Sequence, residues 1–294
     1  MEIPDLSREP YAIAETVSPL IRRVLARNAS PFSYTGTQTY IVGHGDVAVI
    51  DPGPHRDDPE HVGALVRILG DERIVAIMCT HTHRDHSPAA APLAALTGAP
   101  VVGCAPLVIR DDGPRADAGF DDSYAPDTVL SDGDTVSGTG WTLRAVHTPG
   151  HTSNHLCFAL EQEKALFSGD HVMGWSTTVV SPPDGDMGDY MRSLSLMLTR
   201  DDAVYYPAHG NQIERPQRLV RGMIGHRKQR EGQILRTIGA GTHDIAAMVA
   251  AMYKGLDPRL TGAAGRSVLA HLLDLAARGI ARVEGTRWFL VAST

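Results

Sequence analysis

The chain is organised around one seven-residue stretch, Thr80-His81-Thr82-His83-Arg84-Asp85-His86. An apolar, β-branched run over residues 74–79 precedes it and is typical of a buried strand. An Ala- and Leu-rich run with an early proline follows it to Leu96 and predicts a helix. Three histidines and one aspartate therefore lie on a tight loop between a strand end and a helix start. Imidazole and carboxylate groups are the ligands that zinc-like metals prefer, so this loop predicts a metal site.

The spacing within the loop suits two neighbouring metals better than one. On such a turn His81 and His83 can point to one side, and Asp85 and His86 to the other. A single exposed His-x-His pair is more often a pair of solvated side chains, so the downstream sequence must decide. Several further strand-like runs also end in a histidine or an aspartate, namely His151, Asp170 and His209. An α/β scaffold gathers residues that are distant in sequence onto one rim in this way.

Strand and helix patterns alternate over the first 105 residues, which indicates an α/β layered fold. A hairpin is expected over 40–50, a helix over 58–69 and a further strand over 100–104. Downstream, the apolar pattern predicts strands over 141–146, 155–160, 165–168 and 203–206, and a helix over 187–198. Two polar loops, over 105–124 and 172–188, are expected to line the substrate cleft.

Composition places the chain among ordinary globular proteins, with 294 residues, 43% apolar and 21% charged. No apolar run approaches the roughly 18 residues that a bilayer span needs, so no membrane partner is expected. The first residues lack a basic start and an apolar core of a secretory signal, which favours a cytoplasmic location. The three cysteines, Cys79, Cys104 and Cys157, suit reduced core thiols better than a disulfide framework.

The net charge of −7 is unevenly distributed. Residues 215–294 hold 13 Lys and Arg against 5 Asp and Glu, whereas residues 1–214 hold 14 against 29. Such a split suggests two parts with different roles. The second part shows helical patterns over 215–238, 245–252 and 266–278 and then a hairpin over 280–291, which suggests a winged helix. Its basic balance invites a nucleic-acid hypothesis, and the alternative is a module that clamps the cleft or forms a homodimer.

Five motifs in order over residues 35–215 resemble those of the metallo-β-lactamase superfamily. They are Asp51-Pro52-Gly53, the stretch from Thr80 to His86, Thr148-Pro149-Gly150-His151-Thr152, Ser168-Gly169-Asp170 and Pro207-Ala208-His209-Gly210. The resemblance implies an αββα sandwich over residues 1–214, followed by a small C-terminal winged-helix-like domain over 215–294. The runs 189–194 and 224–235 are similar to the lactamase-beta-2-like group, some members of which cleave single-stranded RNA. Ribonuclease-type members tend to carry a histidine where this chain has Thr82, which weakens that substrate assignment.

The resemblance also implies a ligand set for two metals. One metal takes His81, His83 and His151, the other takes Asp85, His86 and His209, and Asp170 bridges both. Two Zn²⁺ ions are the expected cofactors, with Mn²⁺ or Fe as alternatives, and no organic cofactor is expected.

A hydroxide between two such metals is the expected nucleophile, because coordination lowers the pKa of water to about 7. Asp85 is the expected catalytic residue, which orients that hydroxide and shuttles its proton. Asp51 is expected to fix the ligand loops. His147 and His155 are expected to support the site rather than bind metal, and His171 either meets substrate or is structural.

The leading hypothesis is therefore a dinuclear metal-dependent hydrolase. Its substrate is either a phosphodiester in single-stranded RNA or a small ester or thioester, and a lactone or β-lactam hydrolase is the alternative. A regulatory nucleic-acid-binding module with a vestigial site is a hypothesis from another class. Every expected ligand is present in the sequence, so that hypothesis is disfavoured.

Overall fold

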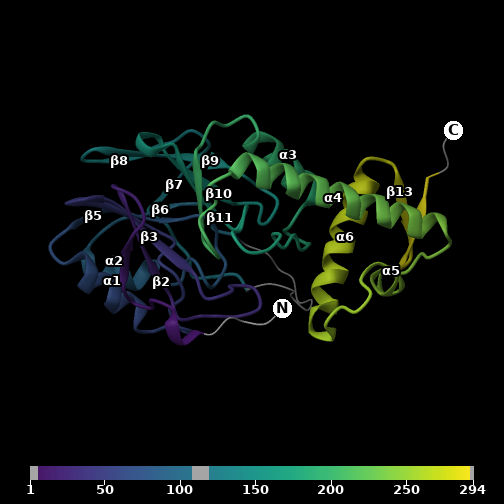
Figure 1. The fold of residues 1–294 in the computed structure, drawn as a ribbon, viewed down its shortest axis with the longest axis horizontal. Helices are drawn as coiled ribbons and strands as arrows, with labels where there is room; N and C mark the ends of the chain where they lie inside the picture. Colours follow the sequence, from purple (N-terminus) through teal and green to yellow (C-terminus); the bar gives the residue numbers. More distant parts are fainter. Residues whose placement is uncertain (1–5, 108–118, 292–294) are drawn as a thin grey trace.

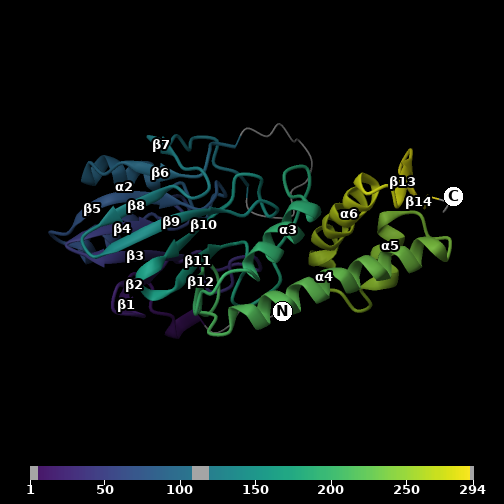
Figure 2. The ribbon, with the colours of Figure 1, turned by 90° about the horizontal axis from the view of Figure 1, so that it is seen from above.

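Two mixed sheets lie face to face in the N-terminal two thirds of the protein (Figures 1 and 2). The structure, a computed structural model, describes residues 6–107 and 119–291. Within those ranges the first sheet has seven strands in chain order: β1 (Ala14–Thr16), β2 (Ile21–Leu25), β3 (Gln38–His44), β4 (Asp46–Ile50), β5 (Arg73–Cys79), β6 (Val101–Gly103) and β7 (Thr128–Val129). A short 3₁₀ turn, η1 (Leu6–Arg8), precedes them.

The second sheet has the order β12-β11-β10-β9-β8. Its strands are β8 (Thr135–Gly138), β9 (Trp141–His147), β10 (Leu156–Leu160), β11 (Ala165–Gly169) and β12 (Val204–Pro207), with the 3₁₀ turn η2 (Glu161–Glu163) between β10 and β11. β9 and β11 are each antiparallel to β10, and β12 is parallel to β11. β9, β11 and β12 therefore run in the same direction, and their C-terminal ends meet at one edge.

Helices cover the outer face of each sheet, which completes the αββα sandwich. α1 (His61–Leu69) and α2 (Ala90–Thr97) pack beside the first sheet, and α3 (Met187–Met197) packs against the second. Both faces of the second sheet are buried. Along β10, Phe158 belongs to the core between the sheets, whereas its neighbour Cys157 packs toward α3. The sequence of β10 is therefore a continuous apolar run, as expected when both faces of the sheet are covered.

The C-terminal part is a helical body with a small hairpin, and it lies at one end of the sandwich (Figure 1). It comprises α4 (Pro216–Gly239), α5 (Ile245–Met252), the 3₁₀ turn η3 (Pro258–Leu260), α6 (Thr261–Ala277), β13 (Ala281–Glu284) and β14 (Arg287–Leu290). Asp244 caps the start of α5, because its side chain accepts a hydrogen bond from the Ala247 N–H. Among the described helices, none is long and apolar enough to cross a membrane.

α4 packs against both parts of the chain with one face. Val220 and Met223 join the core beneath α3, and Ile234 and Ile238 join the core of the C-terminal part. These positions recur at helical spacing, so a single stripe along the helix is buried throughout. The domain boundary predicted between residues 214 and 215 thus lies just before a helix that packs against both the sandwich and the rest of the C-terminal part.

Candidate metal centre

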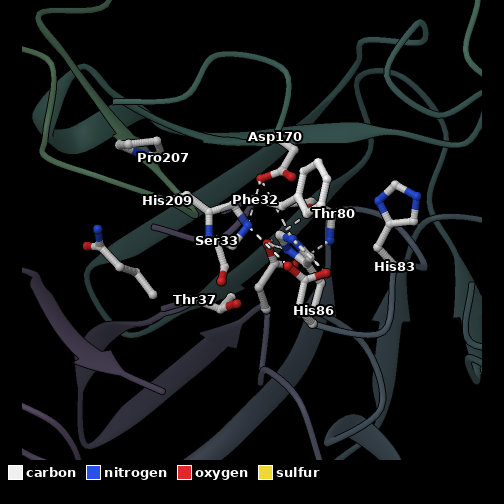
Figure 3. Close-up of polar contacts among 12 residues, drawn as sticks. Phe32, Ser33, Thr37, Thr80, His83, His86, Asp170, Pro207 and His209 are labelled. Atoms are coloured by element: carbon white, nitrogen blue, oxygen red, sulfur yellow. Dashed lines mark hydrogen bonds and ion pairs between the residues drawn. The ribbon is translucent and has the colours of Figure 1, made fainter. Parts of the chain in front are cut away.

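The C-terminal ends of four strands bring the predicted ligands to one edge of the sandwich. The loop after β5 carries four of them, the loop after β9 carries His151, and β11 and β12 are followed by Asp170 and His209. β11 and β12 are parallel, so their ends lie side by side. Figure 3 shows Asp170, His209 and His86 directed toward a common point.

The first group of ligand atoms consists of three imidazole nitrogens. Nε2 of His81 lies 2.9 Å from Nδ1 of His83, and Nε2 of His151 lies 3.0 Å from that same atom. The three rings are at most 4% exposed and converge from two separate loops. These two spacings approach two edges of a tetrahedral zinc site, where each nitrogen lies about 2.0–2.1 Å from the metal.

The second group combines two imidazoles with a carboxylate. Asp85, His86 and His209 offer ligand atoms within 4.8 Å of one another. Nε2 of His209 lies 3.2 Å from Oδ2 of Asp85, and Nε2 of His86 lies 3.6 Å from Oδ1 of the same carboxylate. The second group therefore carries a negative charge that the first group lacks.

Asp170 lies between the two groups and faces each with a different oxygen. Its Oδ2 is 3.6 Å from Nε2 of His151, whereas its Oδ1 is 3.4 Å from Nε2 of His209 and 3.7 Å from Nε2 of His86. A carboxylate in this position can serve two cations at once. Oδ1 of Asp170, Oδ1 of Asp85 and Nε2 of His86 are buried and make no hydrogen bond within the described part of the chain. Buried polar atoms of this kind fit metal coordination, which would satisfy them.

Asp51 holds the ligand loop from behind. Its carboxylate accepts hydrogen bonds from the backbone N–H of Thr80, the hydroxyl of Thr80 and Nδ1 of His86, at 2.8, 2.8 and 3.0 Å. The residue is 2% exposed and has a φ of 48°, a left-handed conformation that costs energy for a residue other than glycine. This arrangement agrees with the expectation that Asp51 fixes the ligand loops.

Backbone carbonyls orient two further imidazoles. Nδ1 of His151 donates to the carbonyl of Val179 at 2.6 Å, and Nδ1 of His209 donates to the carbonyl of Gly36 at 3.1 Å. A donor role at Nδ1 leaves the lone pair of Nε2 free to face the other ligands. The tautomer that a metal needs is thus set by the protein itself.

His155 supports the site without joining it. Its Nε2 accepts the backbone N–H of Asp170 at 3.2 Å, and its Nδ1 lies 2.9 Å from the hydroxyl of Thr148. The ring is fully buried. His155 therefore fixes the backbone that presents Asp170, in line with the supporting role expected for it.

Burial and the carboxylates of Asp85 and Asp170 shift the pKa values of the site histidines in different directions. Burial, reinforced by neighbouring imidazoles, holds the pKa of His81 well below its ordinary value. Burial acts in the same direction on His209, but Asp170 and Asp85 outweigh it and raise the pKa of that imidazole. Conversely, burial opposes ionisation of Asp170, but His209 and His86 hold its pKa well below the usual range. The carboxylates therefore favour positive charge at this edge of the sandwich, which fits the binding of divalent cations.

Three other residues raised by the sequence lie outside the centre. Cys79 is fully buried, and burial raises the pKa of its thiol well above the ordinary value, so it acts as a core residue. His147 is exposed at the rim, where Nε2 faces the carbonyl of Ser153. His171 is fully buried with its ring 5.1 Å from that of Tyr190, so it packs in the core rather than facing the site.

The site opens outward through two adjoining hollows. The inner one is lined by ligand side chains together with Phe32, Met173 and Val179. The outer one has a volume of about 530 Å³ and is lined by Arg27, Arg84, Asp85 and residues of the 28–33 loop. Asp85 lines both hollows and is the ligand nearest to the entrance. Of the two loops predicted to line the cleft, 172–188 contributes Met173 and Val179, and most of 105–124 lies outside the described residues.

Sequence reasoning missed the residues that act through their backbone. Nothing in the sequence distinguishes the carbonyls of Gly36 and Val179 from others. It also missed Phe32, a loop residue whose ring lines the mouth of the site.

Comparison with known proteins identifies the fold that carries this site. The metallo-beta-lactamase superfamily pattern matches residues 34–209. The chain belongs to this superfamily. The beta-lactamase associated winged helix domain matches residues 245–288, which confirms the expected winged helix. The superfamily and the αββα sandwich expected from the five motifs are likewise confirmed, and the protein is a metallo-β-lactamase superfamily hydrolase.

Relatives of this superfamily member include thioesterases. An atrochrysone carboxyl ACP thioesterase of Aspergillus terreus (strain NIH 2624 / FGSC A1156) is 32% identical, over 94% of this chain and 87% of its own. The crystal structure of a beta-lactamase domain protein from Burkholderia ambifaria has a TM-score of 0.80 at 20% identity, over 98% of this chain and 97% of its own. The di-iron-bound form of TTHA1623 has a TM-score of 0.50 at 26% identity, over 66% of this chain and 96% of its own.

Proposed function

We propose that this superfamily member hydrolyses thioesters of small carboxylic acids with two divalent metal ions held at the candidate centre. The observation that carries the proposal is the position of Asp170, whose two oxygens face two separate groups of ligand atoms. His81, His83 and His151 would hold one ion, and Asp85, His86 and His209 would hold the other. The di-iron form of a structural neighbour supports a two-metal site, and Zn²⁺, Mn²⁺ and Fe all remain compatible with these ligands.

The thioesterase relative favours a thioester over the other substrates that the motifs allow. When bound, the two metals would supply Lewis acidity and a water of lowered pKa. Water adds to the carbonyl carbon, the C–S bond breaks and the leaving sulfur takes a proton, so the products are an acid and a thiol. Each step occurs beside Asp85, which lines the entrance. Burial opposes ionisation of this carboxyl, but His86 and His209 outweigh it and hold its pKa below the ordinary value. Asp85 would thus orient the attacking water and pass on its proton.

The two hollows would receive different parts of the substrate. Phe32, Met173 and Val179 offer an apolar wall to the acyl group near the metals. Arg27 and Arg84 lie in the outer hollow, and neither forms an ion pair with any described carboxylate. Nε of Arg84 donates to the carbonyl of Phe120 at 3.0 Å, which fixes this guanidinium at the entrance. These cations suit an anionic group on the substrate, although Asp57 also lines the hollow.

The test is a substrate panel on metal-loaded protein. It comprises acyl-CoA and acyl-N-acetylcysteamine thioesters, a nitrophenyl ester, a lactone, a β-lactam and a single-stranded RNA oligomer. Asp170→Asn is the inactivating variant, and His147→Ala, which removes an exposed rim histidine, is its matched control. We expect thioester cleavage that is lost in Asp170→Asn and retained in His147→Ala. Cleavage of RNA or of the β-lactam alone, or equal activity in both variants, would overturn the proposal.

A further inference from the structure

A buried arginine of α4 reaches out of the C-terminal part into the hydrolase sandwich. Arg227 is 4% exposed and occupies the same stripe of the helix as Val220 and Met223, where the pattern calls for an apolar residue. None of the described carboxylates lies within ion-pair distance of it. A guanidinium is costly to bury without such a partner, so its other contacts must compensate.

Two contacts hold the guanidinium of Arg227. One is with the segment between β11 and α3, and the other is with α3 itself. Nη2 of Arg227 donates to the carbonyl of Thr178. The same group lies over the ring of Tyr190, 5.2 Å from its centroid, as a cation–π contact. Arg266 of α6 adds a second link to this segment, because its Nη1 donates to the carbonyl of Pro182 at 3.2 Å. Arginine side chains of the C-terminal part thus hold the 172–186 segment by donating hydrogen bonds to backbone carbonyls of that segment.

Both contacts of Arg227 lead directly to the ligand His151. Val179, the next residue after Thr178, supplies the carbonyl that accepts Nδ1 of His151. Tyr190 packs so closely on Gly150, the residue before His151, that a Cβ at Gly150 would lie 2.3 Å from Cα of Tyr190. One side chain of α4 therefore supports His151 from two sides.

We propose that Arg227 is a positioning residue for His151, through which the C-terminal part sets the metal affinity of the centre. The proposal rests on the metal ligands of the proposed function. Fixing the Thr178 carbonyl restrains the backbone of the next residue, Val179, whose own carbonyl accepts the His151 ring, and with it the direction of Nε2. Partners that orient a ligand in this way commonly change metal affinity by about 10–100-fold when removed. This gives the winged-helix part a role in the hydrolase that needs no nucleic acid.

The experiment compares metal affinity in Arg227→Met and Arg230→Met full-length proteins, by competition with a chromophoric chelator for Zn²⁺. Arg230 is the matched control, because it also lies on α4 and over an aromatic ring, that of Tyr253, but its contacts stay within the C-terminal part. We expect Arg227→Met to weaken one of two Zn²⁺ sites by at least tenfold, with an altered visible spectrum of the Co²⁺-substituted protein. Arg230→Met should keep the wild-type affinity and spectrum.

Two further variants make each outcome decisive. Arg227→Lys keeps a charge and a donor but loses the planar group over Tyr190, so we expect an intermediate affinity, and it replaces Arg227→Met if that protein does not fold. Wild-type affinity and spectrum in the Arg227 variants, together with a lower melting temperature, would mean that Arg227 only joins the two parts. His151→Ala tests the underlying assignment: if it still binds two metals as tightly as wild type, the proposed ligands are wrong and not merely the role of Arg227.

Discussion

Nδ1 of His86 lies 3.0 Å from Oδ2 of Asp51, although 35 positions separate them in the sequence. The same carboxylate accepts two hydrogen bonds from Thr80 at the start of the ligand loop. One side chain thus fixes both the backbone of the loop and the ring of a candidate ligand. The site depends on this carboxylate although no metal would touch it.

Replacing Asp51 by Asn should therefore weaken metal binding. The amide keeps one acceptor oxygen and turns an NH₂ group toward groups that donate, so at least one hydrogen bond is lost. We expect metal affinity to fall by about 10–100-fold, measured by chelator competition. Asp127→Asn is the control, because Asp127 also accepts a backbone N–H, that of Val101, away from the centre. Equal affinities in the two variants would show that Asp51 has no effect on the ligands.

Gly150→Ala should destabilise the protein through a collision as well as through backbone strain. Gly150 has a φ of 134°, and an added Cβ would lie 2.3 Å from Cα of Tyr190. Gly133 has a φ of 86° with no atom within 4 Å of an added Cβ, so Gly133→Ala isolates the strain. We expect urea denaturation to give a loss of about 1–2 kcal/mol for Gly133→Ala and at least about 1 kcal/mol more for Gly150→Ala. Equal losses would contradict the collision.

Arg84→Met should change the affinity for anionic thioesters and leave the chemistry intact. Its guanidinium lies at the entrance beside Asp85 and is fixed by the carbonyl of Phe120. Loss of one charged contact corresponds to about 1.5 kcal/mol, so KM for an acyl-CoA should rise roughly tenfold. The change in kcat should stay within about twofold, and the neutral acyl-N-acetylcysteamine should be unaffected.

Two comparisons give this prediction its controls. Arg67→Met removes an exposed arginine of α1 and should change neither substrate. Comparing succinyl- with butyryl-N-acetylcysteamine shows whether the anion that matters lies on the acid or on the thiol. A fall in kcat for every substrate would instead place Arg84 in the chemistry.

His271→Leu should flatten the dependence of stability on pH in the acid range. Burial, with the nearby charge of Arg227, lowers the pKa of His271 to about 3. Between about pH 6.5 and pH 3 the unfolded chain would bind a proton there that the folded chain does not, so stability falls as the pH falls. The variant should remove up to about 1.4 kcal/mol per pH unit from this slope, measured by urea denaturation at successive pH values. His55→Gln, which replaces an exposed histidine, is the control, and its plot of unfolding free energy against pH should be parallel to that of wild type. A plot for His271→Leu that is parallel to both would refute the prediction.

Long apolar elements were predictable from the sequence, and short or polar ones were not. β5 and the hairpin β3–β4 agree with their predicted positions because their apolar residues alternate or run continuously. β2 was missed because Arg22 and Arg23 interrupt its pattern, and β8 because it is a short edge strand with little buried surface. α6 begins at Thr261, five residues before its predicted start, because Gly262 and Gly265 weaken the helical signal there.

The histidines and aspartates of the centre could be found because each follows a strand and matches a motif. Their supports could not, apart from Asp51 and His155. A carbonyl such as that of Val179 has no signature in sequence, and Arg227 lies in a polar stretch of α4 that predicts a solvated face. Only the packing of α4 across the sandwich turns that arginine inward.

The continuity of α4 limits how this protein can be reassembled from modules. Because Val220 and Met223 fill the sandwich while Ile234 and Ile238 fill the winged helix, a graft made at residue 214 would strip the hydrolase of part of its own interior. A recombination junction placed after Gly239 would leave the whole of α4, including Arg227, on the hydrolase side. Chimaeras and gene fusions of this protein should therefore tolerate crossovers beyond the helix far better than crossovers at its start.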